Sequence, residues 1–229
     1  MTQPRELLQR LARVDTSAVS DALDVIGYDG VVTGLGPVWR SGSIAGRVIP
    51  VRLVPDDHTN GTKYHLGAAA IEAGGPGDVI VVDNQGRTEM GGWGGLLARA
   101  AAAKGVEGVV LDGACRDVDE LEEIGLPMFA RGATARTARG RVVEQPADEI
   151  RVGDVTVRRG DLVRADRSAV VFIPAQVAAD IIAAAERIAE RESVMAAALT
   201  NGLPPTSVLG ADYEELLSRM AGPDGTAAN

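Results

Sequence analysis

The chain has 229 residues, of which 45% are hydrophobic and only 3% aromatic, and its formal net charge is −9. This length allows one large domain or two small ones, with a core built mostly from aliphatic side chains. The acidic charge argues against direct nucleic-acid binding, which normally requires a basic face. No apolar run approaches the ~20 residues that span a bilayer, and no signal-peptide pattern is present, so we expect a cytoplasmic protein without membrane contacts.

The first third of the chain predicts helix, strand and helix in turn. Residues 4–26 carry apolar side chains at helical spacing, and Asp15 is suited to cap a second short helix within them. Residues 44–54 alternate as a strand does, and residues 64–73 predict another helix.

Several isolated residues can be interpreted either as functional or as structural. His58 and Asp57 lie in a polar loop at residues 55–61, where functional residues are common, although plain loop polarity is the simpler reading. His65, near a predicted helix start, reads as structural. Cys115 is the single cysteine, which excludes an internal disulfide; it reads as a small apolar residue or as a nucleophile.

The middle of the chain alternates buried strand, glycine-rich turn, helix and strand. The first strand covers residues 79–83, the glycines lie at residues 91–95, and the second strand leads into Arg116 and Asp117. This alternation is typical of a crossover unit, whose ligands bind at the carboxyl ends of the strands. Neither a P-loop nor a convincing dinucleotide fingerprint is present.

This stretch suggests chemistry on a small keto acid. The first N–H groups of a helix attract a carboxylate, Arg116 can hold a second anionic group, and Asp117 offers a hard oxygen to a divalent metal. A 2-keto acid chelates such a metal, which stabilises an enolate when a bond beta to the ketone breaks. Alternatively, an Arg-Asp dipeptide is simply a surface ion pair.

The remaining chain predicts an acidic helix, strands and one long helix. Glu120 belongs to a short helix and reads as part of a solvated face. Arg131 has two open readings, acid binding or a surface contact, whereas Arg136 and Arg139 read as surface or interface residues. Residues 141–173 predict antiparallel strands.

After these strands, Pro174 is expected to open a long helix that continues to about Leu199. We expect one compact domain over residues 1–220, with a final short helix at residues 213–220, and a disordered tail over residues 221–229.

Residues 94–97 and 105–117, with the DG-x-x-RD core, resemble the RraA-like family of 4-hydroxy-4-methyl-2-oxoglutarate aldolases and regulators of ribonuclease E activity. The likeness extends from Ser17 to the helix after Pro174. It implies an α/β fold, namely a β/β/α swivelling-type single domain with N-terminal helices and a long C-terminal helix. It also implies a homotrimer or hexamer with active sites between subunits.

The resemblance further implies a class II, metal-dependent aldolase acting on a small-molecule keto acid, with oxaloacetate decarboxylation as a side activity. Arg116 and Asp117 would be catalytic, with Arg116 binding substrate and Asp117 holding Mg²⁺ or Mn²⁺. The substrate carboxylate would be held by a run of backbone amides: Gly94, Gly95, Leu96 and Leu97.

One position departs from the family pattern. The aldolases carry an acidic residue about twenty positions before the Arg-Asp pair, and such residues are worth roughly 10- to 100-fold in metal affinity or activity. Here that position is Gly95. Three other acids are candidates to compensate: Asp83, Glu89 and Asp112. Two more are candidates for a carboxylate that a neighbouring subunit supplies: Glu190 and Glu192.

Two alternative functions therefore stay open. One is a non-catalytic regulator that binds a protein partner such as ribonuclease E, which the acidic charge would suit if the partner is basic. The other is a related lyase with a different substrate, whose pocket Trp93 and Arg87 reshape. Trp93 itself is either a lid or a packing anchor.

Overall fold

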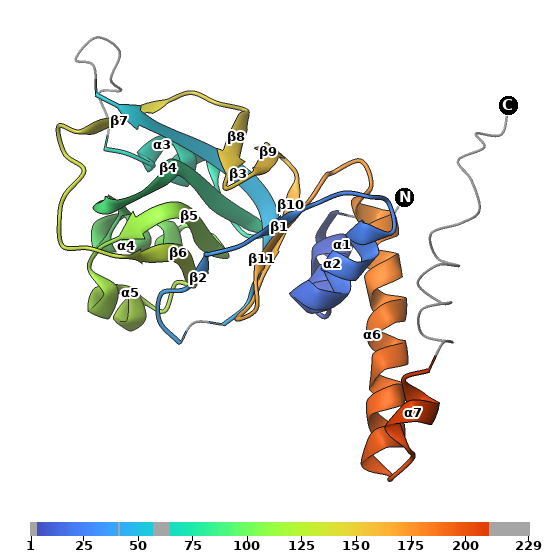
Figure 1. Ribbon diagram of the computed structural model, residues 1–229. Helices are drawn as coiled ribbons and strands as arrows, with labels where there is room; N and C mark the ends of the chain where they lie inside the picture. The colour runs from blue at the N-terminus through green and yellow to red at the C-terminus, as the bar shows by residue number, and fades with distance from the viewer. Residues whose placement is uncertain (1–3, 41, 57–64, 211–229) are drawn as a thin grey trace, which may run out of the picture.

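The computed structural model describes residues 4–40, 42–56 and 65–210. A nine-stranded sheet forms its centre, and a two-stranded sheet lies beside it (Figure 1). None of the described helices is long and apolar enough to cross a membrane.

The large sheet is mixed, with four parallel strands in its middle. Its strands are β1 (Val31–Val32), β2 (Gly36–Pro37), β3 (Ile44–Pro55), β4 (Asp78–Trp93), β5 (Gly108–Cys115), β6 (Met128–Ala133), β7 (Val142–Gln145), β10 (Leu162–Ala165) and β11 (Val170–Ile173). They lie in the order β1-β11-β10-β3-β4-β5-β6-β2, with β7 paired to β3. Strands β3, β4, β5 and β6 are parallel to one another. Strands β8 (Glu149–Val152) and β9 (Val155–Arg158) form the separate antiparallel hairpin.

Helices connect the parallel strands, as the alternating pattern predicts. The helices are α1 (Pro4–Leu11), α2 (Thr16–Asp24), α3 (Ala68–Ala73), α4 (Gly95–Ala103), α5 (Val118–Ile124), α6 (Ala178–Thr200) and α7 (Pro205–Val208). Helices α3, α4 and α5 follow β3, β4 and β5 in turn, which makes three crossover units and brings the carboxyl ends of these strands to one edge.

The core has a layered form because successive strand residues face opposite sides. In β4, Ile80 and Val82 pack in a cluster with residues of α3, α4 and α5, whereas Val79 and Val81 pack with residues of the β8–β9 hairpin. The result is a hairpin, a sheet and a helical layer. The predicted α/β fold is confirmed.

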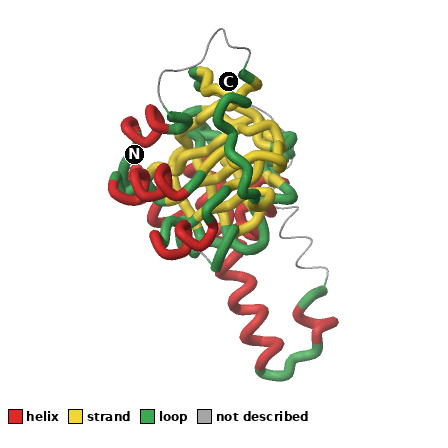
Figure 2. Tube along the Cα trace, turned by 90° about the vertical axis from the view of Figure 1, so that its left-hand side faces the viewer, coloured by secondary structure: helices red, strands yellow, loops and turns green. Residues whose placement is uncertain are grey.

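A third cluster joins α1, α2 and the first half of α6 to the outer face of β11. Asp15 caps α2 as predicted, since its carboxylate accepts the Ala18 N–H at 2.8 Å. Burial along α6 ends at Ile188, and Val194 is 66% exposed. The second half of α6 therefore projects beyond the strands together with α7 (Figure 2).

Helix α6 begins at Ala178 rather than at Pro174. The Asp161 carboxylate accepts the Ala175 N–H at 3.0 Å and Val177 donates to the Pro174 carbonyl, so a turn occupies this segment.

Helix α3 is also shorter than residues 64–73. Gly67 has a left-handed φ of 80° and donates its N–H to the Glu144 carboxylate at 2.7 Å, so the helix starts after it. The short helix predicted at 213–220 and the predicted tail at 221–229 lie outside the described residues.

Candidate active site

A cavity of about 660 Å³ lies where the carboxyl ends of β4 and β5 meet the start of α4. The segment between β6 and β7 forms another of its walls. The residues lining it are Asp56, His65, Leu66, Gly91, Gly92, Trp93, Gly94, Gly95, Leu96, Leu97, Arg116, Asp117, Thr137, Ala138, Arg139, Gly140, Val142 and Val143. The cavity thus brings together the predicted catalytic pair and the four residues with predicted carboxylate-binding amides, at the edge of the sheet where α/β folds bind ligands: Arg116, Asp117, Gly94, Gly95, Leu96 and Leu97.

The glycine-rich stretch forms the end of strand β4 and the N-terminus of helix α4. Gly91 to Trp93 end strand β4 instead of forming a turn, and the register between β4 and β5 shifts repeatedly there. Gly94 is the extended N-cap of α4 and has no side chain to satisfy the first N–H groups. The Gly95 N–H donates to Asp117 Oδ2 at 3.1 Å, which leaves the Leu96 and Leu97 N–H groups for a ligand.

Asp117 is held in an unusual backbone geometry. Its φ of 62° and ψ of 42° are left-handed, and among the described residues only Gln85 is another non-glycine residue with positive φ. The Arg116 N–H donates to the Trp93 carbonyl at 3.0 Å and ties the end of β5 to β4. Arg116 Nε lies 3.1 Å from both Asp117 carboxylate oxygens, so the two side chains form an ion pair inside the cavity.

The sequence alone does not predict that Glu120 lies beside Gly95. A Cβ on Gly95 would lie 1.9 Å from Glu120 Oε2, so this carboxylate occupies the space of the absent side chain. Its Oε1 accepts a hydrogen bond of 2.8 Å from Arg99 on α4. The available signal was the spacing: Glu120 follows Asp117 by three residues, one turn along α5 and on the same side.

The glycines at 94 and 95 are needed for this approach. A Cβ on Gly94 would lie 2.8 Å from Asp117 Oδ2, just as one on Gly95 would collide with Glu120. Two carboxylates therefore lie against the same bare backbone. Carboxylate oxygens are suitable ligands for Mg²⁺ or Mn²⁺, and two of them suit an ion that keeps several waters. No cluster of three or more ligating side chains exists among the described residues.

The other predicted compensating acids do not reach this cavity. Asp83 and Asp112 line a separate hollow of about 670 Å³, and Glu89 is exposed outside both. Glu190 and Glu192 lie on α6, where a single chain does not test a role in a neighbouring site.

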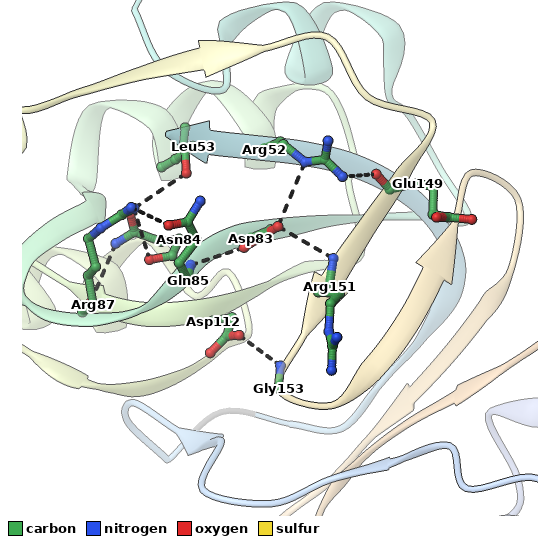
Figure 3. A network of polar contacts seen from close by, with 10 residues as sticks. All are labelled: Arg52, Leu53, Asp83, Asn84, Gln85, Arg87, Asp112, Glu149, Arg151 and Gly153. Carbon is green, nitrogen blue, oxygen red and sulfur yellow. Dashed lines mark hydrogen bonds and ion pairs between the residues drawn. The ribbon is translucent and has the colours of Figure 1, made fainter. Parts of the chain in front are cut away.

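The separate hollow is a network of satisfied polar groups (Figure 3). Asp83 accepts the N–H groups of Gln85 at 3.0 Å and of Arg151 at 3.4 Å. Asp112 accepts the Gly153 N–H at 2.8 Å and pairs with Arg131 through a short contact. Burial raises the pKa of Asp83 above its ordinary value, with the backbone hydrogen bonds partly opposing the rise.

The role of Arg131 was left open between acid binding and a surface contact. Its Nε donates to the Asp112 carboxylate, so this part of the side chain has a structural role. Arg87 donates to the Leu53 and Asn84 carbonyls and does not line the first cavity, so it does not reshape that pocket.

Two further ambiguities are resolved by burial. Cys115 is fully buried, and desolvation raises the pKa of its thiol to about 11, which opposes a nucleophilic role and agrees with the small apolar reading. Trp93 is 2% exposed and its ring packs on Gly67, so it is a packing anchor rather than a lid. His65 is exposed at the cavity, while His58 and Asp57 lie outside the described residues.

Comparison with known proteins shows which family and which solved structures this chain is similar to. The family model described as RraA-like, Aldolase/RraA, matches residues 16–172. "Protein DlpA" of Legionella pneumophila is 32% identical over 171 residues, which are 73% of this chain but only 27% of that protein. The "Putative 4-hydroxy-4-methyl-2-oxoglutarate aldolase" of Halalkalibacterium halodurans is 28% identical over 169 residues, covering 74% of this chain and 77% of that one.

Among solved structures, Streptomyces coelicolor RraAS2, described as an unusual member of the RNase ES inhibitor RraA protein family, matches with a TM-score of 0.75. The identity is 26%, over 82% of this chain and 94% of that one. The recognised sequence pattern, the layered fold and the family model thus agree, and the chain belongs to the RraA-like family.

Proposed function

We propose that the protein is a divalent-metal-dependent lyase that cleaves a pyruvate-derived 2-keto acid. The expected reaction is retro-aldol cleavage of the 4-hydroxy-4-methyl-2-oxoglutarate type, with oxaloacetate decarboxylation as a side activity. The observation that carries this proposal is that the α4 start, Arg116 and Asp117 line one cavity, with the Glu120 carboxylate lying against the backbone of Gly95. The name of the H. halodurans relative supports the same reaction class.

The N–H groups and the guanidinium would bind the substrate, and the carboxylates would bind the metal. The free N–H groups of Leu96 and Leu97, at the positive end of α4, receive the substrate carboxylate. The Arg116 guanidinium binds the adjoining ketone oxygen and stabilises the negative charge that grows there as the carbon–carbon bond breaks. Asp117 and Glu120 would hold Mg²⁺ or Mn²⁺, which when bound supplies a Lewis acid for the same oxygen.

Glu120 supplies a carboxylate where the family's acidic side chain is absent at Gly95. The family's acidic side chain is absent at that position, and a carboxylate from the next helix fills the vacated space. We propose that Glu120 performs the role of the missing acid, and that Arg99 orients it through its other oxygen.

The direct test is pyruvate release from 4-hydroxy-4-methyl-2-oxoglutarate and from oxaloacetate, with Mg²⁺ or Mn²⁺ and with EDTA. We expect turnover that EDTA abolishes, and none from Arg116→Ala or Asp117→Asn, both of which should keep the native circular dichroism spectrum. Asp119→Asn is a matched control, because Asp119 is an exposed carboxylate on the same helix and does not line the cavity. Full activity in Asp117→Asn would contradict the proposal.

A regulator that binds a basic protein partner is the second candidate. The description of S. coelicolor RraAS2 and the net charge of −9 favour it. It predicts that ribonuclease E is bound and inhibited, and that no keto acid is cleaved with either metal. Metal-dependent turnover without binding to that enzyme would eliminate it.

We further propose a homotrimer or hexamer with sites between subunits. The projecting half of α6 and the adjoining α7 expose apolar side chains that a second copy would cover: Val194, Leu203 and Leu209. Light scattering should give a mass of three or six chains. A monomer at micromolar concentration would refute this part alone.

A further inference from the structure

The segment Thr134–Gly140, between β6 and β7, is a fixed wall of the cavity. The Thr134 N–H donates to the Cys115 carbonyl at 2.8 Å, and the Gly91 N–H donates to the Arg136 carbonyl at 2.9 Å. Ala138 is buried in the core beneath it, at 4% exposure. The segment is therefore bound to the ends of the same two strands that present the glycines and the Arg-Asp pair.

Two threonine turns shape this wall. The Thr134 hydroxyl accepts the Arg136 N–H at 3.3 Å, and the Thr137 hydroxyl accepts the Arg139 N–H at 3.1 Å. Hydroxyl-to-backbone bonds of this kind fix the local chain direction. Of the two arginines, only Arg139 lines the cavity.

Among the described residues, the Arg139 side chain at the cavity has no counterion. Arg116 is paired with Asp117, whereas no ion pair or side-chain hydrogen bond engages the Arg139 guanidinium within the described part of the chain. An unpaired guanidinium on a fixed wall is a ready partner for a carboxylate, which it can bind through two parallel hydrogen bonds.

We infer that Arg139 binds the second acidic group of the substrate and makes the site selective for dianionic over monoanionic 2-keto acids. This inference rests on the proposed function. The α4 N–H groups and Arg116 take the keto-acid end, so an acidic group at the other end of the molecule needs a different cation of the cavity lining, and Arg139 supplies one. A cavity of about 660 Å³ has room for both ends of a small dicarboxylic acid.

The test compares two substrates that undergo the same bond cleavage. 4-Hydroxy-4-methyl-2-oxoglutarate carries a second carboxylate, and 4-hydroxy-2-oxopentanoate does not. Arg139→Gln should lower kcat/KM for the first about 10- to 100-fold, mostly through KM, which is the range for loss of a charge-assisted hydrogen bond. It should leave the second unchanged, and Arg139→Lys should restore part of the loss.

Arg136→Gln is the matched control, since it removes a guanidinium from the same wall without touching the cavity. It should leave both substrates unaffected. An equal fall for both substrates in Arg139→Gln, or no change for either, would overturn the inference.

A binding measurement separates this inference from the proposed reaction. Calorimetry in Mg²⁺ with 2-oxoglutarate and 2-oxobutanoate, neither of which needs to be cleaved, should show that Arg139→Gln weakens only the first. That result would support Arg139 as an anion-binding residue even if wild-type protein released no pyruvate. Unchanged affinity for 2-oxoglutarate would refute it.

Discussion

The cavity at the start of α4 and the separate hollow beside the β8–β9 hairpin differ in how the carboxylates near them are used. In the hollow, the side chains of Asp83 and Asp112 are 8% and 5% exposed and hold backbone N–H groups and arginines (Figure 3). Beside the α4 start, Asp117 and Glu120 are 33% and 36% exposed and lie against bare glycine backbone. Buried, satisfied carboxylates attach the β8–β9 hairpin to the sheet, whereas accessible ones are available to a ligand.

The largest effect should come from breaking the buried pair. Asp112→Ala leaves Arg131 and the Gly153 N–H without their acceptor, which should cost about 3 kcal/mol in the free energy of unfolding. Urea unfolding measures it. Asp154→Ala, in an exposed ion pair of the same hairpin, should be indistinguishable from wild type. Equal stability of the two variants would mean that the network does not anchor the hairpin.

The next effect belongs to the accessible pair. Glu120→Gln should reduce metal-dependent turnover about 10- to 100-fold and weaken Mn²⁺ binding, as expected for loss of a residue that supports a metal site. Its unfolding free energy should stay within about 0.5 kcal/mol of wild type, because this side chain is accessible. Mn²⁺ titration by electron paramagnetic resonance reads the binding directly. Unaltered affinity would remove Glu120 from the site.

A double variant sharpens the same point. Gly95→Asp combined with Glu120→Ala returns a carboxylate to the space that Glu120 leaves, and should regain several-fold activity over Glu120→Ala alone. Gly95→Asp without the second change should be less active than wild type, since even its Cβ collides with Glu120. The four-way comparison of turnover measures the coupling between the two positions. Simple additivity would show that they do not share a space.

The smallest effect is a pH dependence in the buried hollow. Because burial raises the pKa of Asp83, the folded protein takes up this proton at a higher pH than the unfolded chain does. Wild type should therefore gain stability relative to Asp83→Asn as the pH falls from neutral through the raised pKa, and lose that gain as the pH rises again. Denaturation series from pH 7 down to the ordinary carboxyl pKa of 3.8 compare the two proteins. A difference that stays constant with pH would contradict the assignment.

Local pattern was sufficient to predict most of the fold. The capped helix after Asp15, the crossover units through residues 78–133 and the antiparallel strands of residues 141–173 are encoded by spacing and turn residues close in sequence. The predicted helix boundaries are wrong where hydrogen bonds to residues distant in sequence determine where a helix begins. Glu144 accepts the N–H of Gly67 just before α3 from 77 positions away, and Asp161 accepts the N–H of Ala175 ahead of α6.

The candidate site was predictable in its main residues but not in its completion. Arg116, Asp117 and the α4 start follow each other along one crossover unit, so their meeting is a consequence of topology. Glu120 was taken for a solvated residue because its importance depends on the absence of a side chain at Gly95, 25 positions earlier. Arg139 was likewise taken for a surface residue, since nothing local shows that its segment bonds to the end of β4.

The backbone at Asp117 has a practical consequence for anyone who stabilises proteins of this fold. Left-handed positions are where glycine is the unstrained choice, so routine engineering would relieve this one by Asp117→Gly. The same conformation directs the carboxylate back toward α4, where it accepts a hydrogen bond from the Gly95 N–H. Thermostabilisation schemes should therefore leave residue 117 unchanged, because a substitution to glycine would relieve the backbone strain only by removing the carboxylate.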